Sequence, residues 1–200
     1  MEDVAPGMPW SRARFQVTIY FAPQFHALRQ LLLDGSDALF AASVSRCRQW
    51  NSRGGKSQAY FAKTRDNRWI VKQLSKTERQ SFLELAPNYF RHVGSALKAR
   101  RATALGKIVG AFQVACRPAG PQSNVTVGPP YTKEGTIDCL IMENMFYGQP
   151  VQRIYDLKGS DRSRYNAEDP TDAGAVLLDE NLKETNTTAP LLVRQCCVFL

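Results

Sequence analysis

The segment from Gln58 to Leu74 constrains the fold more than any other part of the sequence. Two runs of alternating apolar and polar residues, 58–63 and 68–74, are separated by four residues typical of turns, Thr64-Arg65-Asp66-Asn67. Alternation with period two indicates half-buried strands, and so short a connection joins only antiparallel neighbours. The sequence therefore predicts a β-hairpin within a mainly antiparallel sheet and excludes parallel strands joined by crossovers at this point.

Alternating segments and apolar runs elsewhere predict more strands, with helices between them. Further strands are expected at 15–20, 105–116, 137–142 and 151–157, and another element begins at 176–178. Helices are expected at 23–34, 36–45 and 77–86. Pro87 should end the last of these, because proline lacks the N–H that the helix needs. Residues 117–135, rich in Pro, Gly, Ser and Thr, predict a long loop. The order indicates an α+β domain with helices packed on the sheet.

Composition limits the class of protein. With 200 residues and 44% hydrophobic content, the chain can form one domain with a real core. No run approaches the ~18–20 apolar residues that span a bilayer, and no apolar region follows the acidic start, so neither a membrane helix nor a secretory signal is expected.

The five cysteines are odd in number and form no Cys-x-x-Cys. We therefore expect a reduced, intracellular protein without a structural metal.

Charge is unevenly distributed along the chain. Residues 1–133 carry 20 Lys and Arg against 7 Asp and Glu, whereas residues 134–200 carry 6 against 11. A basic half indicates a polyanionic partner, which could be a phosphate ligand, an anionic membrane or nucleic acid. A merely solvated basic surface is the alternative. Because no nucleic-acid-binding motif accompanies the charge, no nucleic-acid partner is expected.

The string Gly54-Gly55-Lys56-Ser57 indicates a phosphate-binding loop of one of two kinds. The nucleotide-binding P-loop also requires a glycine five positions before Gly55, where Trp50 stands, and a helix directly afterwards. Here a predicted strand follows. A glycine loop between two strands, as in protein kinases, is the better match, because glycines let backbone N–H groups approach phosphate oxygens closely.

Kinases pair such a loop with a lysine on a following strand. Lys72 lies in the second arm of the hairpin, after Trp69, Ile70 and Val71, where it could neutralise phosphate charge. An ordinary solvent-facing lysine is the alternative. The glutamate that would hold Lys72 is either Glu78 or Glu84 on the next helix, and we favour Glu78.

Several strings in order go beyond generic kinase features. They are Gly54-Gly55-Lys56-Ser57, Tyr60-Phe61-Ala62-Lys63-Thr64, Arg68-Trp69-Ile70-Val71-Lys72-Gln73, Ser81-Phe82, Ala86-Pro87-Asn88-Tyr89-Phe90, Met142-Glu143-Asn144, Tyr155-Asp156-Leu157-Lys158-Gly159-Ser160 with Arg162 and Arg164, and Val176-Leu177-Leu178-Asp179-Glu180-Asn181-Leu182. Together they resemble the N-terminal part of the kinase domain of the phosphatidylinositol-phosphate kinase family. The Lys-Gln pair and the Ser-Phe…Ala-Pro-x-Tyr-Phe string resemble its type III class, which phosphorylates phosphatidylinositol 3-phosphate at the 5-position. Asp-Leu-Lys-Gly-Ser is the most specific string.

The resemblance implies a role for each matching position. Residues Gly54 to Ser57 would cover the ATP phosphates, and Lys72 and Lys158 would neutralise them as the catalytic cations. The segment Met142-Glu143-Asn144 would lie near the adenine. Asp156 would orient Lys158, although a strand-end cap is an alternative, and Glu78 would support Lys72. Arg162 and Arg164 would meet the lipid headgroup or the membrane surface, with a merely solvated position as the alternative. The family implies ATP and Mg²⁺ as cofactors, a phosphoinositide on an anionic membrane as partner, and a cytoplasmic protein peripheral on endosomal or vacuolar membranes.

The resemblance covers residues 13–193 and leaves a flexible N-terminus at 1–12 and a divergent tail at 194–200. The family's catalytic Met-Asp-Tyr-Ser-Leu-Leu-Val-Gly string and its metal-binding Ile-Ile-Asp string are not among the 200 residues. We therefore expect an incomplete C-terminal lobe with no metal site, and an inactive chain when it is tested alone. A non-catalytic phosphoinositide- or nucleotide-binding module is the alternative function. The ending Cys197-Val198-Phe199-Leu200 also fits a prenylation signal, which the sequence alone does not decide.

Overall fold

A computed structural model describes residues 13–33, 37–50, 59–118, 135–160, 162–168 and 175–188. The expected flexible start at 1–12, the loop at 54–57 and the tail at 194–200 lie outside these residues. The elements within them are β1 (Ala13–Ile19), α1 (Ala22–Leu32), α2 (Asp37–Val44), β2 (Cys47–Gln49), β3 (Phe61–Thr64), β4 (Trp69–Leu74), α3 (Lys76–Lys98), β5 (Ile108–Pro118), β6 (Thr136–Glu143), β7 (Ile154–Tyr155), β8 (Val176–Leu177) and α4 (Asp179–Thr188).

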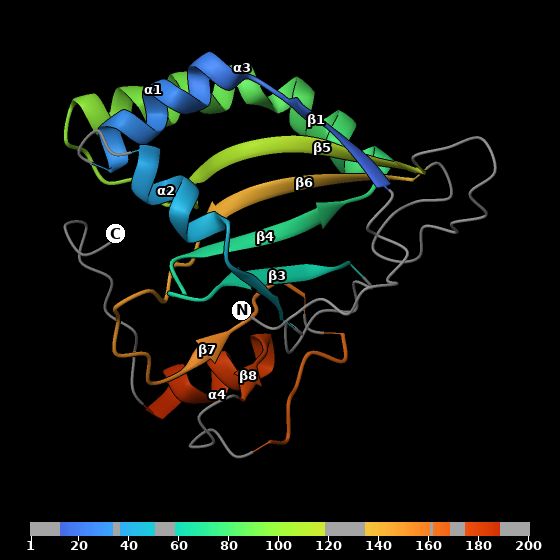
Figure 1. Ribbon diagram of the computed structural model, residues 1–200. Coiled ribbons are helices and arrows are strands. Elements are labelled where there is room, and N and C mark those ends of the chain that lie inside the picture. The colour runs from blue at the N-terminus through green and yellow to red at the C-terminus, as the bar shows by residue number, and fades with distance from the viewer. Residues whose placement is uncertain are drawn as a thin grey trace.

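A six-stranded sheet organises the larger part of the molecule (Figure 1). Its strand order is β1-β5-β6-β4-β3-β2, and every neighbouring pair is antiparallel. The hairpin predicted at 58–74 is present as β3 and β4, with Phe61 opposite Lys72 in the register. The predicted α+β class with a mainly antiparallel sheet is confirmed.

Helices α1 and α3 lie side by side over one face of the sheet (Figure 1). The side chains that form the core between them are Phe25, Leu28, Leu74, Phe82, Ala86, Tyr89, Val93, Ala111 and Leu140. On α3 these positions recur every three or four residues, which places them on one helical face. This layer fixes α3 against β4 and thereby positions the start of the helix.

The opposite face of the sheet has a smaller core beside α2. Trp69, Val109 and Ile141 are buried there, and Phe40 and Val44 of α2 pack against them. Trp69 and Lys72 are three residues apart on β4, so their side chains point to opposite faces of the sheet. Lys72 therefore shares a face with α3, and Trp69 shares a face with α2.

Helix α3 runs to Lys98, so the prediction that it ends at Pro87 is wrong. Pro87 is exposed, whereas Ala86, Tyr89 and Val93 continue the buried stripe on either side of it. The proline removes one backbone hydrogen bond on the solvent side, where water can bind the freed carbonyl, and core packing carries the helix through. The helix is followed by Arg100 in the left-handed region, at φ 50°.

The remaining described residues form a small unit below the sheet (Figure 1). Strands β7 and β8 pair in parallel, and α4 follows β8 after a single residue. The strand predicted at 151–157 is shorter than expected, since only Ile154 and Tyr155 are paired. Strand β5 extends to Pro118, so the loop predicted from 117 begins later, and residues 119–134 lie outside the described residues. No helix in the described ranges is both long and apolar enough to cross a membrane.

Candidate functional site

Lys72 has a carboxylate partner on the adjacent helix. It lies on β4, between β3 and β6, and its Nζ donates to Glu78 Oε1 at 2.8 Å. Glu84, the other candidate, accepts instead from Gln80 Nε2 at 2.8 Å. The structure thus brings Lys72 together with Glu78, the residue favoured from the sequence.

Glu78 is also part of the N-terminal cap of α3. Its Oε2 accepts from the backbone N–H of Ser75 at 2.9 Å, and Ser75 Oγ accepts from the backbone N–H of Glu78 at 3.2 Å. This reciprocal arrangement is a capping box, which satisfies two N–H groups at the helix start. The Lys72 ammonium and the Ser75 N–H hold the pKa of Glu78 below its ordinary value. The carboxylate is therefore ionised and fixed from two sides.

The first turn of α3 is tied to the sheet by a second acidic residue. Asp138 of β6 is buried, and its carboxylate accepts from Arg79 Nη1 at 3.2 Å, Gln113 Nε2 at 3.0 Å and the Tyr20 hydroxyl at 3.2 Å. Burial and the neighbouring Asp138 raise the pKa of Tyr20. Because Arg79 follows Glu78 directly, this contact fixes the end of α3 that faces Lys72.

The segment Met142-Glu143-Asn144 ends β6 beside the β3–β4 turn. The buried Asn144 donates its backbone N–H to the Arg68 carbonyl at 3.0 Å and its Nδ2 to the Asn67 carbonyl at 2.6 Å. The Glu143 N–H donates to the Lys107 carbonyl at 2.9 Å. The segment is thus well anchored. In this conformation its last two N–H groups are already bonded within the protein rather than available to an adenine.

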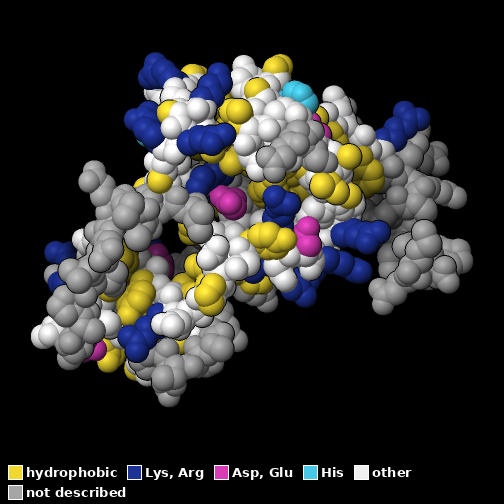
Figure 2. Space-filling model, turned by 90° about the vertical axis from the view of Figure 1, so that its left-hand side faces the viewer, with side chains coloured by type: hydrophobic (Ala, Val, Ile, Leu, Met, Phe, Trp, Pro, Cys, Tyr) yellow, Lys and Arg dark blue, Asp and Glu magenta, His cyan; other side chains and the backbone are white. Residues whose placement is uncertain are grey.

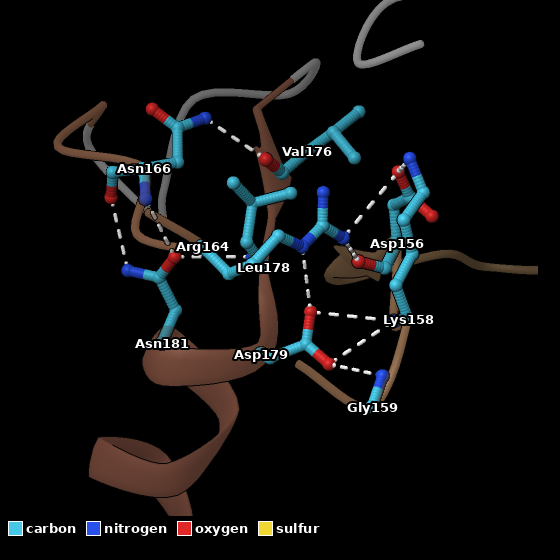
Figure 3. A network of polar contacts seen from close by, with 9 residues as sticks. All are labelled: Asp156, Lys158, Gly159, Arg164, Asn166, Val176, Leu178, Asp179 and Asn181. Carbon is cyan, nitrogen blue, oxygen red and sulfur yellow. Dashed lines mark hydrogen bonds and ion pairs between the residues drawn. The ribbon is translucent and has the colours of Figure 1, made fainter. Parts of the chain in front are cut away.

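Asp179 organises the Asp-Leu-Lys-Gly-Ser segment (Figure 3). Its carboxylate accepts from the backbone N–H of Lys158 at 3.0 Å, from that of Gly159 at 2.7 Å and from Arg164 Nε at 2.8 Å. The Arg164 guanidinium, with the two backbone donors, lowers the pKa of Asp179 to about 2. Gly159 has φ 67°, a left-handed conformation that glycine adopts without strain. The backbone conformation therefore explains why glycine stands at this position of the string.

Arg164 lies inside this network rather than on the surface. Its side chain is only 13% exposed, and besides Asp179 it bonds the Asp156 carbonyl and lies 3.6 Å from the Asp156 carboxylate. The headgroup or membrane contact expected for Arg164 does not suit this placement, because it would break these bonds. Arg162 is exposed and remains suited to such a contact.

Two asparagines close the other side of the same unit. The Asn166 N–H donates to Asn181 Oδ1 at 2.9 Å, and Asn181 Nδ2 returns a bond to the Asn166 carbonyl at 2.9 Å. Asn166 Nδ2 reaches the Val176 carbonyl at 2.9 Å, and Asn181 Oδ1 also accepts from Leu178 N–H at 3.0 Å. Side-chain amides thus replace strand pairing between residues 164–168 and the start of α4 (Figure 3).

Lys158 projects from the ordered turn with its ammonium half-exposed, 3.6 Å from Asp156 Oδ2. The expected neighbours Asp156 and Lys158 therefore lie together. The joint site that Lys72 and Lys158 would form beneath Gly54 to Ser57 stays a prediction, since that loop lies outside the described residues. The described residues include two lysines, Lys72 and Lys158, each paired with a carboxylate. Both side chains are exposed enough to meet phosphate oxygens.

Comparison with known proteins identifies the family of this chain. The family model described as Phosphatidylinositol-4-phosphate 5-Kinase matches residues 44–195.

The chain belongs to this family.

Named members agree with the type III resemblance of the motifs. The chain is 43% identical over 182 residues to 1-phosphatidylinositol-3-phosphate 5-kinase FAB1B of Arabidopsis thaliana. It is 40% identical over 189 residues to the Homo sapiens 1-phosphatidylinositol 3-phosphate 5-kinase, and 37% over 177 residues to FAB1 of Saccharomyces cerevisiae. The matches cover 91%, 92% and 88% of this chain but only 10%, 8% and 7% of those relatives.

Within this family fold, the sequence did not point to every residue that shapes the site. Asp179, Asn181, Asn166, Asp138 and Arg79 make most of the polar contacts described above. Asp179 and Asn181 stood within a recognised family string, which was the available signal. Asp138 and Arg79 had none, because a single charge in a strand or helix gives no indication of a partner distant in sequence.

The described residues include cations but no group of possible metal ligands. The ammonium groups of Lys72 and Lys158 are of the chemical kind that binds phosphate oxygens. Within the described ranges, no three His, Cys, Asp or Glu side chains gather as a possible metal-ligand set. Glu78, Asp138 and Asp179 are each committed to protein donors. These residues therefore do not fit Mg²⁺ by themselves.

Proposed function

We propose that these residues form the nucleotide-binding part of a lipid kinase that phosphorylates phosphatidylinositol 3-phosphate at the 5-position, with ATP as donor. The Lys72–Glu78 pair carries the proposal, because a lysine held 2.8 Å from a fixed carboxylate is a positioned charge for phosphate oxygens. The match over residues 44–195 and the printed names of the relatives support the substrate class.

Each proposed role follows from charge and position. Lys72 and Lys158 neutralise the ATP phosphates, and Gly54, Gly55, Lys56 and Ser57 cover them with backbone N–H groups. The 142–144 segment lies at the adenine, bound through groups other than the two N–H donors already in use. These roles need no rearrangement of the Glu78 cap or of the Asp179 network.

The lipid side of the proposal rests on charge. Arg162 is the exposed cation that meets the headgroup or membrane surface, next to the turn that Asp179 holds. The basic excess of residues 1–133 favours an anionic membrane, and we place the protein at the periphery of endosomal or vacuolar membranes. Added salt should weaken such binding.

Phosphoryl transfer also needs a metal on the phosphates and a group that orients the attacking hydroxyl. The described residues offer no metal-ligand set, so we assign no step through Mg²⁺ to them. A second candidate function for the 200 residues taken alone is a non-catalytic module that binds phosphoinositides or nucleotides, and the basic excess of residues 1–133 favours it.

Two measurements separate these functions. The first is binding of a fluorescent ATP analogue to the 200-residue chain and to Lys72→Ala, with Lys98→Ala as an exposed control at the other end of α3. Loss of one phosphate-binding cation should weaken binding by about tenfold, whereas the control should bind like the unaltered chain. Equal affinities for all three would refute the role of Lys72.

The second measurement is transfer of radiolabelled phosphate to phosphatidylinositol 3-phosphate in vesicles. We expect no turnover by the 200 residues and clear turnover by a longer protein that adds the family's two aspartate strings. Turnover by both would mean that a catalytic carboxylate lies within the 200 residues. Turnover by neither, with ATP analogue binding intact, would favour the binding module.

A further inference from the structure

A cleft of about 360 Å³ lies between α2 and the turn that joins β3 to β4. We call it the α2 cleft. Its lining residues include Leu39, Phe40, Arg46, Arg65, Arg68 and Trp69. Its volume lies within the range of about 300–1,000 Å³ typical of ligand sites.

The α2 cleft lies on the face of the sheet opposite Lys72. Trp69 lines the cleft from the face of the sheet that packs against α2, whereas Lys72 points to the face covered by α3. Figure 2, which views the molecule from the end where α1 and α2 lie, shows hydrophobic side chains next to basic ones on this side. An occupant of the cleft would therefore not compete with ATP for Lys72.

The floor of the α2 cleft is apolar and aromatic. Trp69 is 3% exposed, and the Phe40 ring meets it edge-on at 5.5 Å. Leu39 is 67% exposed, an unusual position for a large apolar side chain beside a cavity. The indole Nε1 of Trp69 is buried and has no hydrogen-bond partner within the described residues.

The rim of the α2 cleft is positively charged. Arg46 and Arg65 are exposed, and Arg68 lies over the rings of Trp69 at 5.3 Å and Tyr147 at 5.7 Å. Asp66 is the one carboxylate among the lining residues. It already accepts from Ser43 Oγ and Thr64 Oγ1, both at 2.6 Å, and from the Arg68 N–H at 3.1 Å. The arginines therefore dominate the field that an occupant would meet.

A smaller hollow of about 90 Å³ continues from the cleft along the 142–144 segment. It shares Leu33, Arg68 and Trp69 with the cleft and extends to Glu143 and Tyr147. Because the two hollows have these lining residues in common, they adjoin each other at Trp69. Two adjoining hollows suit an occupant with more than one contacting group rather than a compact ion.

We propose that the α2 cleft is a docking site for an acidic peptide segment of a partner protein. An apolar side chain of that segment lies between Leu39 and Trp69, and flanking carboxylates meet Arg46 and Arg65. Charge complementarity selects an acidic occupant, and the concave apolar floor selects a side chain rather than a flat membrane surface. The proposal stands independently of kinase activity.

The test uses the 200-residue chain and a fluorescein-labelled peptide in which phenylalanine is flanked on both sides by paired aspartates. Fluorescence anisotropy should show saturable binding that weakens as salt is added. Replacing the phenylalanine by alanine, or the aspartates by lysines, should each weaken binding by about tenfold or more. Absence of saturable binding would overturn the proposal.

Variants locate the peptide on the protein. Arg46→Glu with Arg65→Glu should weaken peptide binding by about tenfold or more. The control Arg101→Glu with Arg153→Glu makes the same change in net charge at exposed positions elsewhere and should leave binding unchanged.

The apolar contact is tested at Leu39. Leu39→Ala should weaken peptide binding by about threefold, whereas the control Leu85→Ala, at a position of similar exposure, 55%, should not. Thermal unfolding verifies that each variant is folded. Equal losses in test and control variants would show binding by general charge and overturn the proposal.

A membrane is the competing occupant, and vesicles of phosphatidylcholine with phosphatidylserine test it. If the Arg46 and Arg65 reversals abolish vesicle binding while the peptide never binds, the face belongs to a lipid surface and the proposal is wrong. If the peptide binds and vesicle binding is unaffected by these reversals, the α2 cleft is a protein-docking site.

Discussion

The sheet with α1 and α3 and the unit from Ile154 to Thr188 are held together by different forces. The first buries a continuous set of apolar side chains, including Phe25, Phe82 and Val93. The second buries Asp179 and Asn181, whose side chains bond backbone groups across a loop. Apolar packing depends on volume and tolerates changes of pH. Directional bonds to one carboxylate depend on its charge, so the small unit should be the part that a single proton can loosen.

The largest effect is expected in the apolar core. Phe25 is fully buried, and its ring meets Phe90 at 4.9 Å and Phe82 at 6.5 Å. Phe25→Ala removes this packing and leaves a cavity, so the free energy of unfolding should fall by about 3–5 kcal/mol. Urea denaturation followed by fluorescence measures it. Phe15→Ala, at a position 54% exposed, should change stability by less than about 0.5 kcal/mol. Similar losses in both would contradict the assigned core.

A smaller and local effect is expected at Asp179. Asp179→Asn keeps the shape but turns part of an acceptor into a donor, which faces the N–H groups of Lys158 and Gly159. Exchange of these two amides with solvent should speed up by about tenfold or more, while amides of β4 to β6 keep their protection. Glu180→Gln is the matched control on the next residue. Loss of protection throughout the sheet would show that the sheet and the unit from Ile154 to Thr188 unfold together, and would contradict the assignment of different forces to them.

Acid should reproduce that loosening without a mutation. Asp179 has a pKa of about 2, below its ordinary 3.8, because Arg164 and two backbone N–H groups bind the carboxylate. Since the unfolded unit takes up the proton first, the stabilisation is complete above about pH 4 and is lost as pH falls through about 2. The amide shift of Gly159 should follow this transition by NMR.

Asp37 provides a control for the acid transition within the larger region. Its pKa is also about 2, held there mainly by Arg29, and it anchors α2. Asp37→Asn should leave the Gly159 transition in place, and Asp179→Asn should remove it. A Gly159 transition that persists in Asp179→Asn would assign it to another group.

The smallest effect is a gain in stability at the end of α3. The backbone N–H of Arg101 bonds Ala96 O and that of Arg100 bonds Leu97 O, an ending that needs a left-handed residue at Arg100. Glycine adopts this conformation without strain, so Arg100→Gly should raise the free energy of unfolding by about 0.5–1 kcal/mol. Thermal unfolding measures the gain. Arg101→Gly should bring none.

The sheet was predictable because alternating residues and apolar runs both indicate which side chains are buried. The hairpin at 58–74, the strand at 137–142 and the helix face of Phe82 each follow from patterns of apolar residues. The continuation of α3 past Pro87 was not predictable by the local rule, because packing by Tyr89 and Val93 outweighs one lost hydrogen bond. The partners of α3 there are α1 and, through the bonds of the Tyr89 hydroxyl to Ile108, the start of β5, and the local sequence reveals neither.

A residue of the candidate site was predictable only where its local position in a helix or strand also brings it close to its partner. Glu78 lies three residues after Ser75, a spacing that places it at the helix start and within reach of the strand that ends at Leu74. Arg164 was expected to face lipid and instead bonds Asp179, fifteen residues later in the chain. An arginine on a loop has no periodicity to orient it, so its partner emerges only from the folded backbone.

The capping role of Glu78 limits how this chain can be altered. Only Ser75 separates β4 from α3, and the two oxygens of Glu78 are divided between Ser75 and Lys72. One residue inserted after Ser75 would turn the helix by about 100° relative to the strand, given 3.6 residues per turn. The helix could then begin correctly or keep its carboxylate at Lys72, but not both. Insertions and deletions at this connection should be far less acceptable to the protein than substitutions of comparable size.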